Sequence, residues 1–220
     1  MIKDIIKIII NFISELIYPT TCGMCNCLSK DGICEKCEAL LKRYEINQRR
    51  YNLRYNFQRM HVYVYEDSIR KIIIGYKFYN KAYLYKTFSN LLLKNKKVCG
   101  FLKNYDIIIP VPIHKKRKQE RGYNQTELIA RDLSKNTHLV LEKNVLVKTK
   151  NIVAQSSLDK YKRKQNINGA FKLVNEEKIY NKNILIFDDI YTTGSTVKEC
   201  AITLSKAKPN KIGVLTIAKD

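Results

Sequence analysis

The chain has 220 residues, 45% of them hydrophobic, which is enough apolar side chain for one globular core with a small attachment. This composition excludes an intrinsically disordered chain. Lysine and arginine outnumber the acidic residues by 41 to 20, and the net charge of +21 points to polyanions: nucleic acid, nucleotides, phosphorylated metabolites or an anionic membrane surface. A lysine excess beside abundant isoleucine, asparagine and tyrosine can also reflect codon bias.

The N-terminal segment has the periodicity of an amphipathic helix. Charged residues interrupt it too early for the roughly 20 apolar residues of a membrane span, and no signal-peptide cleavage site follows. We therefore expect a cytoplasmic protein whose first helix packs on the body of the fold, with membrane-surface or partner binding as the alternative. The apolar positions at helical spacing are Ile2, Ile5, Ile6, Ile9, Phe12, Ile13 and Leu16.

Five of the seven cysteines fall between residues 22 and 37. Two Cys-x2-Cys pairs, Cys22 with Cys25 and Cys34 with Cys37, have the spacing of a tetrahedral zinc site with a structural role. The alternative is a pair of disulfides, which the absence of a secretion signal disfavours. Cys27 is one position off this pattern and is interpreted as a bystander.

The rest of the chain alternates between strand-like and helix-like segments. A basic connector with interspersed aromatic residues, 43–59, precedes this region. Short apolar runs separated by helical patterns are typical of an α/β fold around a mainly parallel sheet. The expected strands are 60–67, 105–113, 139–148, 183–189 and 211–219, and the expected helices are 68–97, with a break near Asn80, 124–136 and 195–208.

The segment NILIFDDIYTTGST predicts a ligand site at the end of a buried strand. Two carboxylates, Asp188 and Asp189, lead into a turn of small hydroxylated residues before a helix begins. The N–H groups at a helix start bind phosphate, while the carboxylates need a hydroxylated or cationic partner. A 5-phosphorylated ribose satisfies both demands. The alternative is an acidic loop before a threonine-capped helix. The turn comprises Thr192, Thr193, Gly194, Ser195 and Thr196.

Three sequence blocks resemble known families. ILIFDDIYTTGST resembles the phosphoribosyl diphosphate (PRPP) motif of type I phosphoribosyltransferases. Residues 107–133, with Arg-Gly-Tyr-Asn-Gln, and residues 155–171 resemble blocks of the ComF competence-protein family, which also carries a four-cysteine module. The resemblance implies a type I phosphoribosyltransferase-like α/β domain, 60–220, preceded by a small zinc ribbon with its helix, 1–42, and the connector, 43–59.

The resemblance also implies roles for individual residues. Asp188 and Asp189 would hold the ribose hydroxyls as the catalytic pair, and Tyr191 through Thr196 would bind the 5-phosphate. Tyr191 departs from the usual smaller residue at its position. Mg²⁺ would accompany PRPP, and residues 150–170 would form a hood loop over the site. The residues expected on the pyrophosphate side are Lys115, Arg121, Gln155 and Arg163.

Three hypotheses for function follow. The first is an active phosphoribosyltransferase of unknown acceptor. The second is a catalytically silent PRPP-sensing or single-stranded-DNA-binding accessory of DNA uptake, with competence proteins as partners. The third is a metabolic role unrelated to DNA. In the second case, stacking aromatics and arginines of the connector would bind DNA, whereas the alternative is a linker packed on the body. These residues are Arg43, Tyr44, Arg49, Arg50, Tyr51, Arg54, Tyr55, Phe57 and Arg59.

Overall fold

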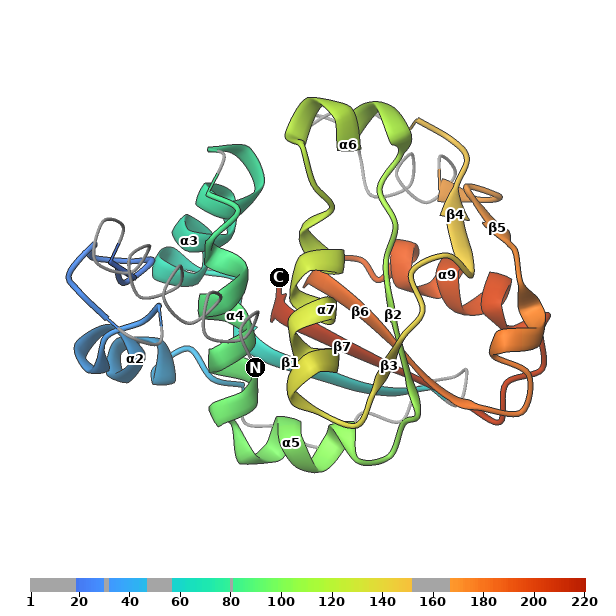
Figure 1. Ribbon diagram of the computed structural model, residues 1–220, viewed down its shortest axis with the longest axis horizontal. Helices are drawn as coiled ribbons and strands as arrows, with labels where there is room; N and C mark the ends of the chain where they lie inside the picture. The colour runs from blue at the N-terminus through green and yellow to red at the C-terminus, as the bar shows by residue number, and fades with distance from the viewer. Residues whose placement is uncertain (1–18, 30–31, 47–56, 80, 152–166) are drawn as a thin grey trace, which may run out of the picture.

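The computed structural model describes residues 19–29, 32–46, 57–79, 81–151 and 167–220. The N-terminal amphipathic pattern and most of the connector lie outside the described residues. A five-stranded parallel sheet with strand order β1-β7-β6-β2-β3 forms the centre (Figure 1). Its strands are β1 (Gln58–Val64), β2 (Ile107–Pro110), β3 (Val140–Leu141), β6 (Asn183–Tyr191) and β7 (Lys211–Lys219).

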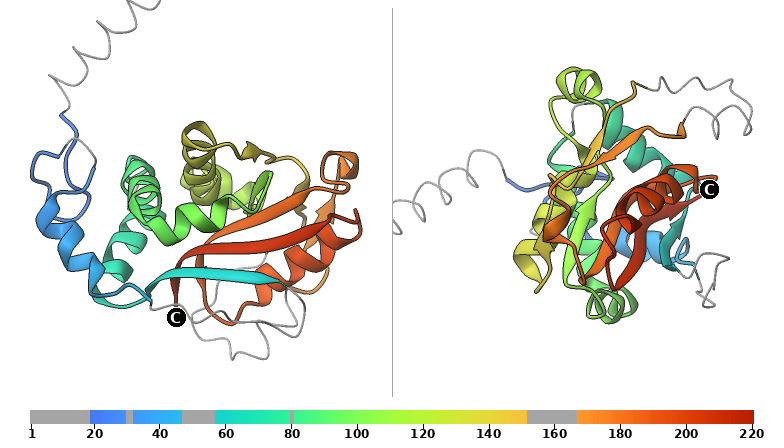
Figure 2. Two further views of the ribbon diagram at one scale, coloured as in Figure 1. Left: turned by 90° about the horizontal axis from the view of Figure 1, so that it is seen from below. Right: turned by 90° about the vertical axis from the view of Figure 1, so that its right-hand side faces the viewer.

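Helices cover both faces of the sheet (Figure 2). One face carries α3 (Asp67–Phe78), α4 (Leu84–Lys94), α5 (Lys96–Leu102) and α7 (Gln125–Asn136), and the other carries α9 (Ser195–Ser205). A small antiparallel hairpin, β4 (Leu146–Lys148) and β5 (Phe171–Leu173), and the short 3-10 helix η1 (Glu176–Lys178) lie on the α9 side of the molecule.

The sequence of β6 explains this layering. Its side chains alternate between the two faces, so that Leu185 and Phe187 join the core under α3, α4 and α7, while Ile184 and Ile186 join the core under α9. A strand buried on both faces must be continuously apolar, as this one is up to its carboxyl end. The α/β fold with a mainly parallel sheet that the sequence predicts is confirmed.

Several element boundaries differ from the expectations. The helical pattern 68–97 forms three helices, and the first of them, α3, begins at Asp67 with Glu66 at its N-cap position. The side chain of Asn95 caps α5 by accepting from the N–H groups of Lys97 and Val98. The expected strand region 139–148 divides into β3 and β4, which belong to different sheets. No helix in the described part of the chain is both long enough and apolar enough to cross a membrane.

The basic segment after β2 also forms a helix, although its sequence lacks the periodicity of apolar residues that would predict one. This helix, α6 (Lys115–Arg121), is charged nearly throughout and buries none of its residues. The His114 side chain accepts from the Lys116 N–H at its start, and Gly122 ends it in the left-handed conformation with φ 82°. These local caps, not a hydrophobic face, account for the helix.

The cysteine module is joined to the main core. It contains α2 (Glu35–Lys42), and Cys22, Ile33, Cys37 and Leu41 lie in the same buried cluster as α3 and α4. The Thr87 hydroxyl of α4 donates to the Gly32 carbonyl at 2.6 Å. The module is therefore part of the packing of the fold.

Candidate functional site

The acidic pair lies at the carboxyl end of β6, where parallel sheets bind ligands. Asp188 and Asp189 are 8% and 4% exposed. Because they are neighbours on a strand, they face opposite sides of the sheet. Asp189 contacts Lys77 and Gln125, whereas Asp188 raises the pKa of the buried Cys200 thiol and is influenced by the positive charges of Lys77 and Lys148. The pair is thus two distinct carboxylates in two environments.

Donors hold both oxygens of Asp189. Lys77 Nζ lies 2.7 Å from Oδ1, and Gln125 Nε2 donates to Oδ2 at 2.8 Å. These two side chains come from the end of α3 and the start of α7, which approach the sheet edge from the same face. Asp189 is therefore held in one orientation and paired with a cationic side chain by the protein itself.

Asp188 differs in its protonation. Burial, reinforced by the negative charge of Asp189, raises its carboxyl pKa to about 7, against an ordinary value of 3.8. Its Oδ1 accepts from the Asp189 backbone N–H at 2.9 Å. Near neutral pH this group exchanges a proton readily, so the pair contains one fixed carboxylate and one group that can take up or release a proton.

The turn after β6 has the geometry of an anion site. Gly194 has φ 75°, a left-handed conformation that glycine adopts at little cost, and it occupies the N-cap position of α9 without a side-chain cap. The Thr193 hydroxyl lies 2.9 Å from the Ser195 hydroxyl, while Thr192 and Thr193 are exposed. The first-turn N–H groups of α9 and these hydroxyls can together bind a phosphate.

Tyr191 supports this turn from below. Its ring lies 4.5 Å from the ring of His61, and the Arg59 guanidinium, which donates to the Tyr191 hydroxyl, stands 5.0 Å from the ring centre. A side chain at position 194 would collide with the Tyr191 hydroxyl. Tyr191 therefore supports the phosphate turn and accounts for the glycine at 194.

Arg59 and His61 are site residues that sequence reasoning did not find. Arg59 was grouped with the connector, but it belongs to β1, two strands away from β6. Burial lowers the pKa of His61 to about 4, so this ring is neutral and does not repel the guanidinium. No local pattern around β1 indicates this role, because the juxtaposition depends on strand order.

The residues predicted for the pyrophosphate side lie in different parts of the structure. Lys115 is exposed on α6, above the sheet edge in Figure 1. The Arg121 guanidinium donates to Gln125 Oε1 and lies 5.5 Å from the ring centre of Phe78, so it is joined to Asp189 through Gln125. Gln155, Arg163 and most of the predicted hood loop lie outside the described residues. Lys77 and Gln125 are further site residues missed from sequence; only Gln125 stands in a block quoted for its resemblance.

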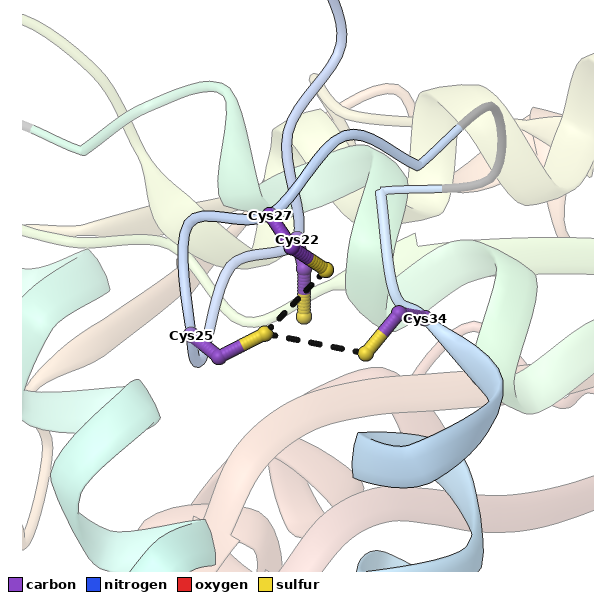
Figure 3. A group of neighbouring side chains, drawn as sticks. All are labelled: Cys22, Cys25, Cys27 and Cys34. Carbon is purple, nitrogen blue, oxygen red and sulfur yellow. Dashed lines mark hydrogen bonds between the residues drawn. The ribbon is translucent and has the colours of Figure 1, made fainter.

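The thiols of the cysteine module converge (Figure 3). The sulfur atoms of Cys22, Cys25, Cys27 and Cys34 all lie within 4.8 Å of one another, with Cys25 3.3 Å from Cys27 and 3.6 Å from Cys34. Cys27, which the spacing assigns as a bystander, therefore stands inside the cluster. Cys37, the fourth ligand predicted from spacing, is outside this group of four but interacts with Cys22, Cys25 and Cys34.

The cluster fits a metal ion in its donor chemistry. The backbone N–H of Cys27 lowers the pKa of the Cys25 thiol to about 6, and the backbone N–H of Cys37 lowers the pKa of Cys34. Such bonds favour the thiolate, which is the metal-binding form, at Cys25 and Cys34. The pKa of Cys27 is raised by its hydrogen bond with Cys25 and that of Cys37 by burial, so these two thiols would lose their protons on binding the metal. Four thiolates close a tetrahedral site and suit zinc in a structural role.

Mg²⁺ fits the acidic pair less well. Both oxygens of Asp189 already have donors, one of them cationic, and Asp188 is protonated to a large extent near neutral pH. Hard divalent cations prefer ionised, accessible carboxylate oxygens. The pair is therefore not arranged for direct binding of a divalent metal.

No family model matches the chain. Comparison with individual proteins finds similarity to competence and DNA utilization proteins. Competence protein F of Haemophilus influenzae is 31% identical over 159 residues, which are 70% of this chain and 69% of that protein. DNA utilization protein YhgH of Escherichia coli K12 is 31% identical over 141 residues, 62% of this chain and 61% of the relative. Competence protein ComFC of Bacillus subtilis is 26% identical, with 74% and 65% covered.

Two solved structures share limited similarity with the chain. Glutamine phosphoribosylpyrophosphate amidotransferase from B. subtilis matches with a TM-score of 0.40 and 16% identity, covering 60% of this chain and 25% of that one. A hypoxanthine phosphoribosyltransferase from Staphylococcus aureus matches with a TM-score of 0.36 and 18% identity, covering 62% and 65%.

Proposed function

The chain belongs to the ComF family of competence proteins, and from this premise we propose that it binds PRPP and acts in the handling of DNA during uptake. The observation that carries the proposal is the end of β6, where a buried acidic pair leads into a glycine-centred turn and the start of α9, whose N-cap residue Gly194 supplies no side-chain cap. A 5-phosphoribosyl group needs a phosphate site and hydroxyl acceptors about one sugar apart. This unit supplies both, and it stands beside the cationic helix α6.

The residues divide the recognition of PRPP among them. The N–H groups of the α9 start and the hydroxyls of Thr192, Thr193 and Ser195 receive the 5-phosphate. The ribose hydroxyls donate to the acceptor positions of Asp188 and Asp189 that internal donors leave open, because a carboxylate offers about four such positions. Lys115 and its α6 neighbours, which are exposed, attract the diphosphate.

Transfer chemistry at this site would displace pyrophosphate from the anomeric carbon of the ribose. Positive charge then develops on the sugar, and the Asp189 carboxylate stabilises it electrostatically. Asp188 is suited to accept or return a proton because its pKa is about 7. The acceptor that attacks the sugar is left open, and a protein that senses PRPP without turnover would use the same contacts.

PRPP is expected to stabilise the folded protein. At a free ligand concentration of a hundred times the dissociation constant, the free energy of unfolding should rise by about 2.7 kcal/mol, which a thermal shift assay detects. The double substitution Asp188→Asn with Asp189→Asn removes the hydroxyl acceptor charges and should abolish the shift. An undiminished shift in this variant would place the PRPP site elsewhere. Steady release of pyrophosphate with a nucleobase would favour the transferase over the sensor.

Binding of single-stranded DNA is the second candidate function. It is favoured by the exposed aromatic residues Phe78 and Tyr79, each 69% exposed, which lie at the end of α3 near the basic helix α6 through the Arg121–Phe78 contact. Bases stack on exposed aromatic rings, and cationic side chains meet the phosphates. The connector predicted for this role from sequence is described only in part.

Replacement of three connector arginines, Arg49, Arg50 and Arg54, by glutamine is expected to weaken single-stranded DNA binding. Affinity for DNA falls as salt rises, and loss of three phosphate contacts should make this fall shallower, reducing the magnitude of the slope of log affinity against log salt by about 2. Fluorescence anisotropy with a labelled oligonucleotide at several salt concentrations measures both effects. Replacement of Lys115, Lys116 and Lys118 by glutamine removes the same number of charges from α6 and is the matched comparison for the connector variant. PRPP binding should survive the connector changes, and absence of DNA binding by the unmodified protein at low salt would favour the transferase.

A further inference from the structure

The ribose side of the proposed PRPP site contains a cation supplied by the protein. Lys77 Nζ and Asp189 Oδ1 are 2.7 Å apart, with the two side chains 16% and 6% exposed. An ion pair shielded from water in this way interacts more strongly than one on the surface. Lys77 is the last lysine of α3, and the helix holds its ammonium group against the carboxylate.

A hydrogen-bonded chain fixes the other side of the same carboxylate. Gln125 Nε2 donates to Asp189 Oδ2 at 2.8 Å, and the Gln125 amide oxygen accepts from Arg121. The backbone carbonyl of Gln125 accepts from the Tyr76 hydroxyl at 2.8 Å, beside Lys77 in α3. Gln125, one of the two donors to Asp189, is thus itself held on both its side chain and its backbone, and this arrangement forms without a ligand.

We propose that Lys77 is a positioning residue that takes the place of a divalent metal ion on the ribose side of the site and holds Asp189 oriented toward the sugar hydroxyls. The sugar ligand rests on the proposed function, whereas the exclusion of metal does not. A metal ion bound to Asp189 Oδ1 would stand against the Lys77 ammonium, and like charges at contact distance repel. Any Mg²⁺ that accompanies PRPP therefore enters with the diphosphate and not through Asp189.

The first test measures the affinity of the protein for Mn²⁺, added as MnCl2 alone. Binding is detected by the paramagnetic relaxation of water protons. Lys77→Met removes the ammonium but keeps the length of the side chain, and this variant is expected to bind Mn²⁺ at least about tenfold more tightly than the unmodified protein. Adding Asp189→Asn should cancel the gain. Lys71→Met, on the exposed side of α3, is the matched control and should behave like the unmodified protein. Failure of Lys77→Met to gain Mn²⁺ affinity overturns the proposal.

The second test uses ribose 5-phosphate, which offers the hydroxyls and the phosphate without a diphosphate to carry metal. Calorimetry without added divalent cation and with MnCl2 should give the same affinity for the unmodified protein within about twofold. Lys77→Met should bind about tenfold more weakly without added divalent cation, since a charge-assisted contact is lost, and should recover in Mn²⁺. Lys77→Arg, which retains the charge, should bind without metal.

The outcomes separate the two ideas. A requirement of the unmodified protein for Mn²⁺ in binding ribose 5-phosphate overturns the role of Lys77, and this measurement needs no variant, so it remains decisive if Lys77→Met does not fold. Failure of ribose 5-phosphate to bind under any condition overturns the proposed function. The Mn²⁺ comparison still tests the exclusion of metal by Lys77 in that case.

Discussion

Asp188→Asn is expected to raise the free energy of unfolding at pH 8, although it removes a carboxylate from the candidate site. The carboxyl pKa is about 7 in the folded protein because of burial and the charge of Asp189, against 3.8 ordinarily. Between these values the folded protein holds a proton that the unfolded chain has released. The contribution of Asp188 to stability is therefore fully present below pH 3.8 and is lost as pH rises through about 7.

The size of this effect follows from the two pKa values. Each pH unit between them corresponds to about 1.4 kcal/mol, so ionisation of Asp188 destabilises the folded state by up to about 4 kcal/mol. Asparagine cannot ionise, but its side-chain oxygen can still accept from the Asp189 backbone N–H. The variant should therefore gain about 2 kcal/mol at pH 5, where only the unfolded chain has released the proton, and about 4 kcal/mol at pH 8, while it loses affinity for PRPP. Stability sacrificed for ligand binding is a common property of functional sites.

Urea denaturation at pH 5 and pH 8 measures the difference. Glu177→Gln changes the net charge by the same amount at an exposed position, and its effect on stability should stay within about 0.5 kcal/mol at both pH values. An equal loss of stability at both pH values in Asp188→Asn would contradict the argument, because it would mean that the ionised carboxylate is well accommodated in the folded protein.

The acidic pair and the phosphate turn were predictable because they are local. A buried apolar run, two carboxylates and a glycine-containing turn before a helix dictate a strand–turn–helix unit without reference to the rest of the chain. The order of burial along β6 also follows from its alternation. The same holds for α7, where Asn124 caps the helix at the predicted start.

The partners of this unit were not predictable because packing brings them there. Lys77 is one of many lysines on helical segments, and only the approach of α3 to the carboxyl edge distinguishes it from an exposed one. Arg59 looks like part of a basic connector until β1 is placed beside β7. Cys27 reaches the other thiols because Asn26 has φ 61°, a reversal that cysteine spacing does not reveal.

Removal of zinc is expected to destabilise the whole protein and not the cysteine module alone. Leu41, Ile33 and Cys22 are 0%, 3% and 0% exposed in the core shared with α4. Burial of one such aliphatic side chain contributes about 1.5–3 kcal/mol. Unfolding of the module uncovers this surface and removes the bond from Thr87 to the Gly32 carbonyl. We therefore expect the melting temperature to fall by about 10 °C when a chelator removes the metal.

Three measurements check this expectation. Elemental analysis should give one zinc per chain, and its absence would contradict the metal site. Thermal melting with and without chelator should shift the single transition, and hydrogen exchange should accelerate in α4 as well as in α2. Melting of the module at unchanged stability of α4 would show that the two fold independently.

Matched serine variants identify the fourth ligand. The spacing of the two Cys-x2-Cys pairs predicts that Cys37→Ser loses zinc and that Cys27→Ser retains it, whereas the sulfur positions place Cys27 in the group of four. The backbone N–H of Cys37 favours the Cys34 thiolate, and Cys37 is buried at the start of α2, where a bound metal would join that helix to the loop. Zinc loss in Cys27→Ser alone would instead assign the site to Cys22, Cys25, Cys27 and Cys34. The metal would then be bound without a ligand from within α2, and it would stabilise the shared core through the loop that contains Cys22, Cys25 and Cys27.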